Sequence, residues 1–207
     1  MSVPIGVPAA VVEGVDEIAS AITRRTRRTG LPTPILTRFG ADGDVPAAVL
    51  VSGTAEETAR GFVAAAVDDD TCPGGVIRYA AAQARRLGVS LRAVHVWTGR
   101  AKTPHGTRMP WSDQVSGADR LLSQVLYDHL PTARADATER EILHDADVAR
   151  ALVALSAEAA LIVVAARSTP LTGGEPLGQT VRELVGRTAC PLAVLPPGPD
   201  RPGHSPR

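Results

Sequence analysis

The chain has 207 residues, and its 22 basic residues balance 22 acidic residues, so its formal net charge is zero. A neutral chain has no long-range field that attracts nucleic acid or anionic lipid by itself. No apolar run approaches the ~20 residues that are needed to cross a bilayer. Composition therefore argues against a nucleic-acid partner and against a membrane partner.

The two cysteines, Cys72 and Cys190, are far apart in the sequence and lack the spacing of metal ligands. The opening segment MSVPIGVPAAVV is too short and too interrupted by proline for a signal peptide. We therefore expect a reduced, cytoplasmic protein. The length suits one domain of ordinary size with additional segments.

Residues 1–60 are predicted to form an amino-terminal extension. Apolar residues recur at helical spacing within 11–30, and this segment ends in a basic cluster, as suits the carboxyl end of a helix. Two short strands are expected within 33–39 and 46–53. A helix with a basic end before a proline-led strand also occurs at 179–196, so the extension is either a remnant of a preceding repeat or a chance match.

From residue 62 the chain alternates between strand signals and helix signals. Strands are expected at 62–70, 89–97, 137–143, 160–166 and 190–196. Helices are expected at 74–88, 118–130, 147–159 and 179–188, with a loop over 98–117. The order predicts an α/β fold, namely a five-stranded parallel, doubly wound sheet with helices on both faces. Residues 61–197 form this predicted domain, and the proline-rich tail 198–207 is expected to be disordered.

A loop of small residues follows the strand at 160–166 and leads into a helix, which is the layout of a phosphate site. The chain has a single lysine, Lys102, so a phosphate must be bound by arginine or by backbone amides. Pro170 and Pro176 remove two amide donors from the loop. Parallel sheets bind ligands beyond the carboxyl ends of their strands, so this loop and the acids that end the first strand can share one pocket.

Residues 62–197 resemble a universal stress protein domain of the adenine-nucleotide-binding α-hydrolase-like superfamily. The likeness rests on VAAAVDDDTCPGGVIRYAAAQARRLGVSLRAVHVW, DADVARALVALSAEAALIVVAARS and TACPLAVLPP. Members that bind ATP carry Gly-x-x-Gly, then nine residues, then Gly followed by Ser or Thr. This chain keeps that spacing but has Ala165 and Ser168 in place of the two loop glycines and Gln179 in place of the hydroxyl residue.

The resemblance implies an adenosine contact by the Asp that ends the first strand and by a Val near the end of the second. These positions are Asp68 and Val96, and both residue types are retained. Replacing glycine with a residue that has a Cβ hinders the close approach of a phosphate to the backbone amides. The expected site residues are Asp68, Val96, Ala165, Arg167, Ser168, Gly178, Gln179 and Thr180.

For several of these residues a structural role is the alternative. Asp68, Asp69 and Asp70 can hold magnesium through water, or they can simply end a strand and begin a turn. Arg167 can pair with a phosphate or lie exposed on the surface. We assign Asp68 to the site and treat the two following acids as solvated.

The resulting hypothesis is a stress-response module that binds ATP or another adenine nucleotide weakly, with magnesium as a candidate companion. The rival is a nucleotide-free, dimeric scaffold of the same fold. An enzyme is not predicted, because no nucleophile and base pair and no Ser-Gly-Gly-x-Asp-Ser loop is visible. The last strand is expected to lie at a sheet edge and to form a homodimer with a second copy, unless a strand from 46–53 covers that edge.

Overall fold

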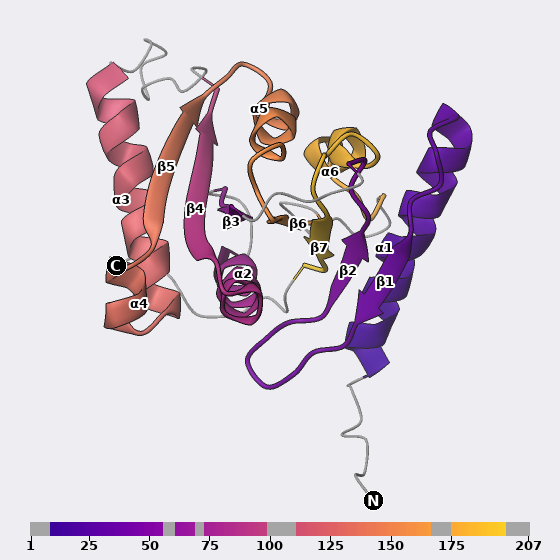
Figure 1. The fold of residues 1–207 in the computed structure, drawn as a ribbon, viewed down its shortest axis with the longest axis horizontal. Helices are drawn as coiled ribbons and strands as arrows, with labels where there is room; N and C mark the ends of the chain where they lie inside the picture. Colours follow the sequence, from indigo (N-terminus) through magenta and orange to yellow (C-terminus); the bar gives the residue numbers. More distant parts are fainter. Residues whose placement is uncertain (1–8, 56–60, 69–72, 99–110, 167–174, 198–207) are drawn as a thin grey trace, which may run out of the picture.

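The computed structural model describes residues 9–55, 61–68, 73–98, 111–166 and 175–197 (Figure 1). The helices are α1 (Ala9–Thr29), α2 (Pro73–Leu87), α3 (Trp111–His129), α4 (Thr132–Asp136), α5 (Val148–Leu155) and α6 (Gln179–Leu184). The strands are β1 (Leu36–Phe39), β2 (Ala48–Val51), β3 (Phe62–Ala66), β4 (Ser90–Trp97), β5 (Glu139–His144), β6 (Leu161–Ala165) and β7 (Leu192–Leu195).

All seven strands belong to one sheet with the order β1-β2-β7-β6-β3-β4-β5. The five strands from β7 to β5 are parallel, as predicted, and the doubly wound α/β class is confirmed. The number of strands is larger than predicted, because β1 and β2 join the sheet antiparallel. The chain steps outward from β3 to β4 and β5, then returns to place β6 on the other side of β3. This reversal creates a crevice beyond the carboxyl ends of β3 and β6.

Helices cover the sheet on both faces (Figure 1). One hydrophobic cluster joins α1, α5 and α6 to one face, and a second joins α2 and α3 to the other. Strand β3 shows why the sequence folds in this way, since successive residues such as Val63 and Ala64 belong to opposite clusters and are both completely buried. A strand buried on both faces must be apolar at every position, which explains the uniform runs in the sequence.

Glycine ends two of the helices that build these layers. Gly30 follows α1 with a φ of 66°, and Gly88 follows α2 with a φ of 68°. The backbone N–H of Val89 donates to the carbonyl oxygen of Ala84 at 3.1 Å, which closes the last turn of α2. Residues with a Cβ rarely adopt this left-handed conformation, so glycine sets the helix length.

A strand of the amino-terminal extension pairs with the last strand, where a second copy of the chain was predicted to pair. Strand β2 lies antiparallel to β7, with Val49 opposite Val194 and Leu50 opposite Ala193. The other edge of β7 is paired with β6. Both edges of the last strand are therefore occupied within one chain, and the predicted route to a homodimer is wrong. The alternative that a strand from 46–53 covers this edge is the one observed.

Local boundaries also differ from the predictions. Helix α3 begins at Trp111, within the segment that was predicted as a loop, and the short helix α4 was not predicted. Helices α5 and α6 end earlier than expected, at Leu155 and Leu184, and the strands are shorter by a few residues. Among the helices that the structure describes, none combines the length and the apolar character that a bilayer crossing requires.

Candidate functional site

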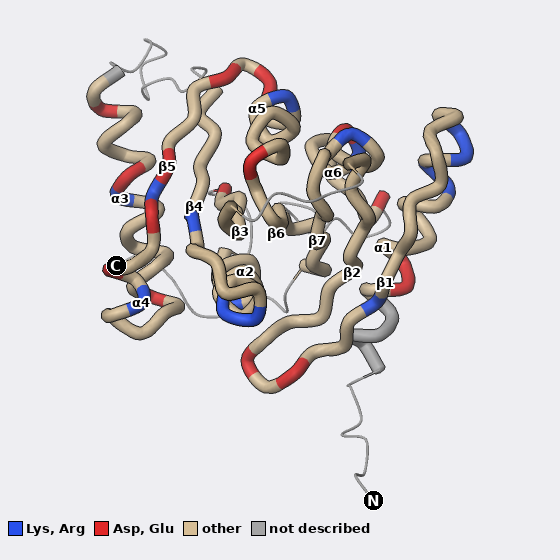
Figure 2. The backbone as a smooth tube through the Cα atoms, viewed as in Figure 1, with Lys and Arg blue, Asp and Glu red and all other residues tan. Residues whose placement is uncertain are grey.

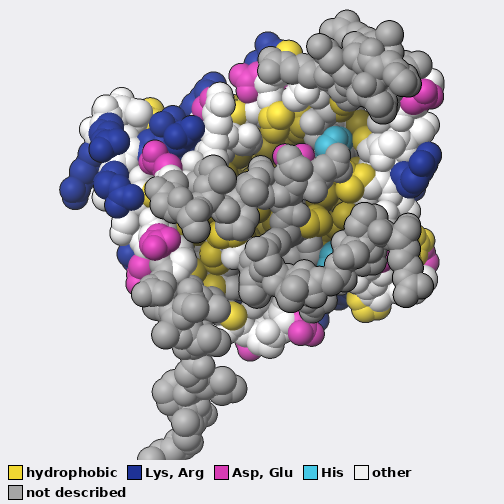
Figure 3. Space-filling model, turned by 180° about the vertical axis from the view of Figure 1, so that it is seen from behind, with side chains coloured by type: hydrophobic (Ala, Val, Ile, Leu, Met, Phe, Trp, Pro, Cys, Tyr) yellow, Lys and Arg dark blue, Asp and Glu magenta, His cyan; other side chains and the backbone are white. Residues whose placement is uncertain are grey.

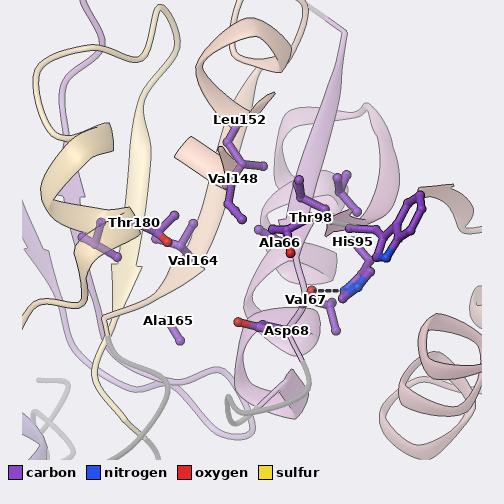
Figure 4. A pocket seen from close by; sticks show the side chains of 14 residues that line it. Ala66, Val67, Asp68, His95, Thr98, Val148, Leu152, Val164, Ala165 and Thr180 are labelled. Atoms are coloured by element: carbon purple, nitrogen blue, oxygen red, sulfur yellow. Dashed lines mark hydrogen bonds between the residues drawn. The ribbon is translucent and has the colours of Figure 1, made fainter. Parts of the chain in front are cut away.

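A cleft of about 400 Å³ opens at the carboxyl ends of β3, β4 and β6, beside α5 and α6 (Figure 4). Its volume lies within the usual range for small-molecule sites. The described residues that line it are Ala66, Val67, Asp68, Val94, His95, Val96, Trp97, Thr98, Val148, Leu152, Val164, Ala165, Thr180 and Val181. Among these described residues, Asp68 is the only acidic one, and there is no Lys or Arg.

Asp68 lies two residues after the end of β3 and points into the space between β3 and β6, toward Ala165 (Figure 4). The residue before it is held from two sides. The N–H of Val67 donates to the carbonyl oxygen of Val94 at 2.8 Å, and the carbonyl oxygen of Val67 lies 3.0 Å from Nδ1 of His95. A carbonyl only accepts, so Nδ1 of His95 is the donor in this bond. The end of β3 is thus fixed to β4 immediately before Asp68.

The walls of the cleft are branched apolar side chains. Val94 and Val96 come from β4, Val164 from β6, and Val148 and Leu152 from the first turns of α5. Apolar walls with a few polar groups at the rim are typical of small-molecule sites. The predicted adenosine contacts Asp68 and Val96 therefore lie in the same cleft.

The structure describes the two ends of the segment that leads from β6 into α6, up to Ala166 and from Glu175 onward. Ala165 and Thr180 line the cleft. The N–H of Gly178 is hydrogen-bonded to the carbonyl oxygen of Ala166 at 2.7 Å. The side-chain amide of Gln179 donates to Oε1 of Glu183 at 2.9 Å, and its role as a donor to phosphate stays a prediction. Arg167 and Ser168 lie outside the described residues.

Charged side chains beside the cleft are engaged with one another. Arg150 on α5 donates through Nη2 to Oδ1 of Asp145 at 2.6 Å, and this contact lowers the pKa of the Asp145 carboxyl. The carboxylate of Asp147 accepts from the backbone N–H of Arg150 at 3.1 Å and caps α5. On α6, Nη1 of Arg182 lies 3.6 Å from Oε2 of Glu175. Acidic and basic residues both lie on the segments at α5 and α6 (Figure 2).

The described residues offer no cluster of side chains that would bind magnesium together with Asp68. Within them no group of three or more His, Cys, Asp or Glu side chains converges as a metal site. Asp69 and Asp70 lie outside the described ranges.

Sequence reasoning missed the contribution of α5 and of Trp97, whereas Val96 on the same strand, β4, was predicted. Val148 and Leu152 are four residues apart and therefore share the helix face that meets the cleft. Trp97 also lines the cleft, and its ring lies 4.5 Å from that of His144, its partner across β4 and β5. The helix spacing was readable in the sequence, whereas the pairing of β4 with β5 requires the fold.

A family model and curated relatives of this chain both point to the same protein family. A sequence model of the universal stress protein family matches residues 63–196. Universal stress proteins of Mycobacterium bovis and Mycobacterium tuberculosis are each 27% identical over 172 residues, which cover 74% of this chain and 54% of the relative. The chain thus spans about half the length of these curated relatives.

The solved structures that are similar to this chain include two universal stress proteins. A universal stress protein from Archaeoglobus fulgidus, solved in complex with dAMP, is 22% identical with a TM-score of 0.47, and the match covers 65% of this chain and 96% of that one. A universal stress protein from Lactobacillus plantarum is 18% identical with a TM-score of 0.48, and the match covers 67% of this chain and 99% of that one.

Proposed function

Because the chain belongs to the universal stress protein family, we propose that its cleft binds an adenine nucleotide weakly and that the module signals through its bound or empty state. The observation that carries the proposal is the placement of Asp68 and Val96 in one cleft. Their residue types match the adenosine contacts that the family pattern implies. The apolar walls supply burial for the base, and the rim supplies polar partners.

Weak binding is proposed because the phosphate loop has lost the residues that bring amides close to an anion. Ala165 stands where the ATP-binding pattern has glycine, and Gln179 bonds to Glu183 rather than pointing into the cleft. A site that binds mainly the base and sugar is expected to have a dissociation constant between micromolar and millimolar, or roughly 4 to 8 kcal/mol of binding free energy.

Equilibrium binding of ATP and AMP to the full chain, with and without magnesium, tests this function. Saturable binding in the micromolar to millimolar range is expected. Asp68→Ala should weaken it, whereas Asp128→Ala, which removes an exposed carboxylate from α3, should not. Absence of saturable binding at millimolar ligand would reject the nucleotide function and favour a nucleotide-free interaction protein of the same fold.

A second variant tests the loop. Ala165→Gly combined with Ser168→Gly and Gln179→Ser restores the ATP-binding pattern. This change should tighten ATP binding more than AMP binding, because amides and a hydroxyl regain access to the terminal phosphates. If the ratio of the two affinities stays the same, phosphates do not bind near this loop.

A further inference from the structure

We infer that the outer face of α1 is an interaction surface for a second copy of this chain, whose own α1 docks on it in antiparallel orientation. This inference goes beyond the proposed function, because no described residue of α1 lines the cleft. It follows from the way in which acidic and basic side chains are distributed along α1.

Helix α1 lies at the rim of the molecule, with one face toward the core and one toward solvent (Figure 1). On the inner face Ile18 and Ile22 are buried in the core. Arg25 also turns inward, since its Nε donates to the carbonyl oxygen of Arg182 on α6. The outer face of α1 is formed by exposed polar residues, which are Asp16, Glu17, Ser20, Arg24, Arg27 and Arg28.

The charges on this outer face are separated by sign. Asp16 and Glu17 lie toward the amino end of the helix, and the three arginines lie toward its carboxyl end. Figure 3 shows a group of basic side chains over α1, at the side of the molecule. A second α1 in antiparallel orientation presents the reverse order of charges, so acidic residues meet basic residues in both halves of the contact.

Stabilisation of the helix itself does not account for this arrangement. The helix dipole acts on charges in the first and last turns, whereas Glu17 and Arg24 lie more than one turn from either end of α1. Their separation of seven residues exceeds the three or four at which side chains pair along a helix. Asp16 pairs with Arg38 on β1 at 2.7 Å, but neither Glu17 nor Arg24 forms an ion pair among the described residues. Both side chains are therefore available to a partner.

A two-fold axis fits the positions of these charges. When the axis passes at the level of Ser20, midway along the segment from Glu17 to Arg24, each glutamate lies opposite the arginine of the other chain, and the contact occurs twice. A residue on the axis meets its own copy, so a charge there would repel itself. Ser20 is short and uncharged, and it lets the two helices approach closely.

Sedimentation of the full chain over a range of protein concentrations tests the inference. One helix face buries less than the ~800 Å² per partner of a standard interface, so we expect weak association. Exposed ion pairs are screened by salt, so added salt should shift the equilibrium from dimer toward monomer. A chain that stays monomeric at the highest concentration in low salt would overturn the inference.

A charge exchange identifies the surface. Glu17→Arg and Arg24→Glu each place like charges opposite one another, so either variant alone should raise the dissociation constant of the dimer by about tenfold or more. An equimolar mixture of the two variants should recover the dimer, because each altered position then faces a charge of opposite sign. Arg120→Glu, which reverses an exposed charge on α3, is the control and should leave association unchanged.

Two results would contradict this surface. If the mixture of Glu17→Arg and Arg24→Glu does not recover the dimer, the two side chains do not meet across it. If the unaltered chain binds polyglutamate as a monomer, and only Arg24→Glu weakens that binding, the basic half of the outer face serves an acidic partner instead. All the changed residues are exposed, so the melting temperatures of the variants should match that of the unaltered chain.

Discussion

His95 and Val67 are joined by a hydrogen bond of 3.0 Å between Nδ1 and the carbonyl oxygen, which ties the end of β3 to β4. This bond fixes the backbone immediately before Asp68. His95→Val removes the donor and should weaken adenosine binding by about two- to tenfold, the equivalent of one hydrogen bond. His95→Asn keeps a donor at a similar position and should retain most of the affinity. Titration calorimetry checks both variants.

Thermal unfolding separates positioning from a general loss of structure in these variants. If His95→Val and His95→Asn lower the melting temperature equally and weaken binding equally, the histidine contributes to packing alone. The expected result is that the two variants differ in affinity more than in stability.

Because β2 pairs with β7, Val194 lies inside the sheet and not at its edge, which changes the expected effect of a charge at this position. Val194 and Val49 are opposite each other and completely buried. Val194→Lys buries an unpaired charge, so it should unfold the chain rather than convert a dimer to a monomer, at a cost of several kcal/mol. Thr37→Lys, on the exposed part of β1, should leave stability within about 0.5 kcal/mol.

Sedimentation and thermal unfolding of both lysine variants are the measurements. A Val194→Lys protein that is folded and monomeric, obtained from a wild-type dimer, would show that β7 pairs with a second copy in solution. The structure leads us to expect an unfolded or aggregated variant instead.

The helices and strands that could be predicted from the sequence are those with a clear local pattern of apolar residues. Strands β3, β6 and β7 were found because each is a short, uniformly apolar run, whereas β4 and β5 mix apolar and polar residues. The start of α3 was missed because Gly, Pro and Ser suggested a loop, although Gln114, Ala118 and Leu122 recur at helical spacing and are buried. The pairing of β2 with the last strand was anticipated as an alternative, but its antiparallel direction and its register could not be predicted from a short apolar run.

Of the expected site residues, the structure places Asp68, Val96, Ala165 and Thr180 at the cleft. Asp68 and Val96 lie at strand ends, where the direction of the strand fixes their place. The orientation of Gln179 depends instead on a choice between the cleft and Glu183, which lies four residues later on the same helix. Such a pair is visible in the sequence, but its free energy is a few tenths of a kcal/mol, too small to decide the orientation without the structure.

Gly53 follows β2 where the chain passes close to the segment before β7. A Cβ at this position would lie 2.0 Å from the carbonyl oxygen of Ala189 and 2.6 Å from the carbonyl carbon of Cys190. Gly53→Ala should therefore lower the free energy of unfolding by about 1 to 3 kcal/mol or more, because backbone must move. Gly117→Ala, on the exposed side of α3 with open space around it, should instead raise it by about 0.5 to 1 kcal/mol.

Chemical denaturation of the two alanine variants compares them directly. Equal and small effects would mean that the segment before β7 gives way without cost. That result would also weaken the argument that the extension is tightly fitted to the last strand.

Cys190 is buried before β7, and burial raises the pKa of its thiol to about 11. The thiolate is the reactive form, so the folded protein should react slowly with an alkylating reagent at neutral pH. In a Cys72→Ser variant Cys190 is the only cysteine, and its alkylation should be limited by unfolding. The rate should therefore rise with denaturant as the unfolded population rises. Fast alkylation in native buffer would contradict the burial of this side chain.

The pair of Asp145 and Arg150 predicts a dependence of stability on acid. The hydrogen bond from Arg150, and then the N–H of Asp147, hold the pKa of the Asp145 carboxyl below its usual value. A carboxyl with a lowered folded pKa stabilises the folded state above its unfolded pKa of about 3.9, and this contribution is lost as the pH falls through the folded pKa. Arg150→Ala should raise the pKa of Asp145, as read by an NMR titration of its carboxyl carbon, and should reduce the fall in stability below about pH 4. Arg120→Ala, which removes an exposed arginine of α3, should change neither quantity, and an unshifted Asp145 titration in Arg150→Ala would show that the arginine does not set this pKa.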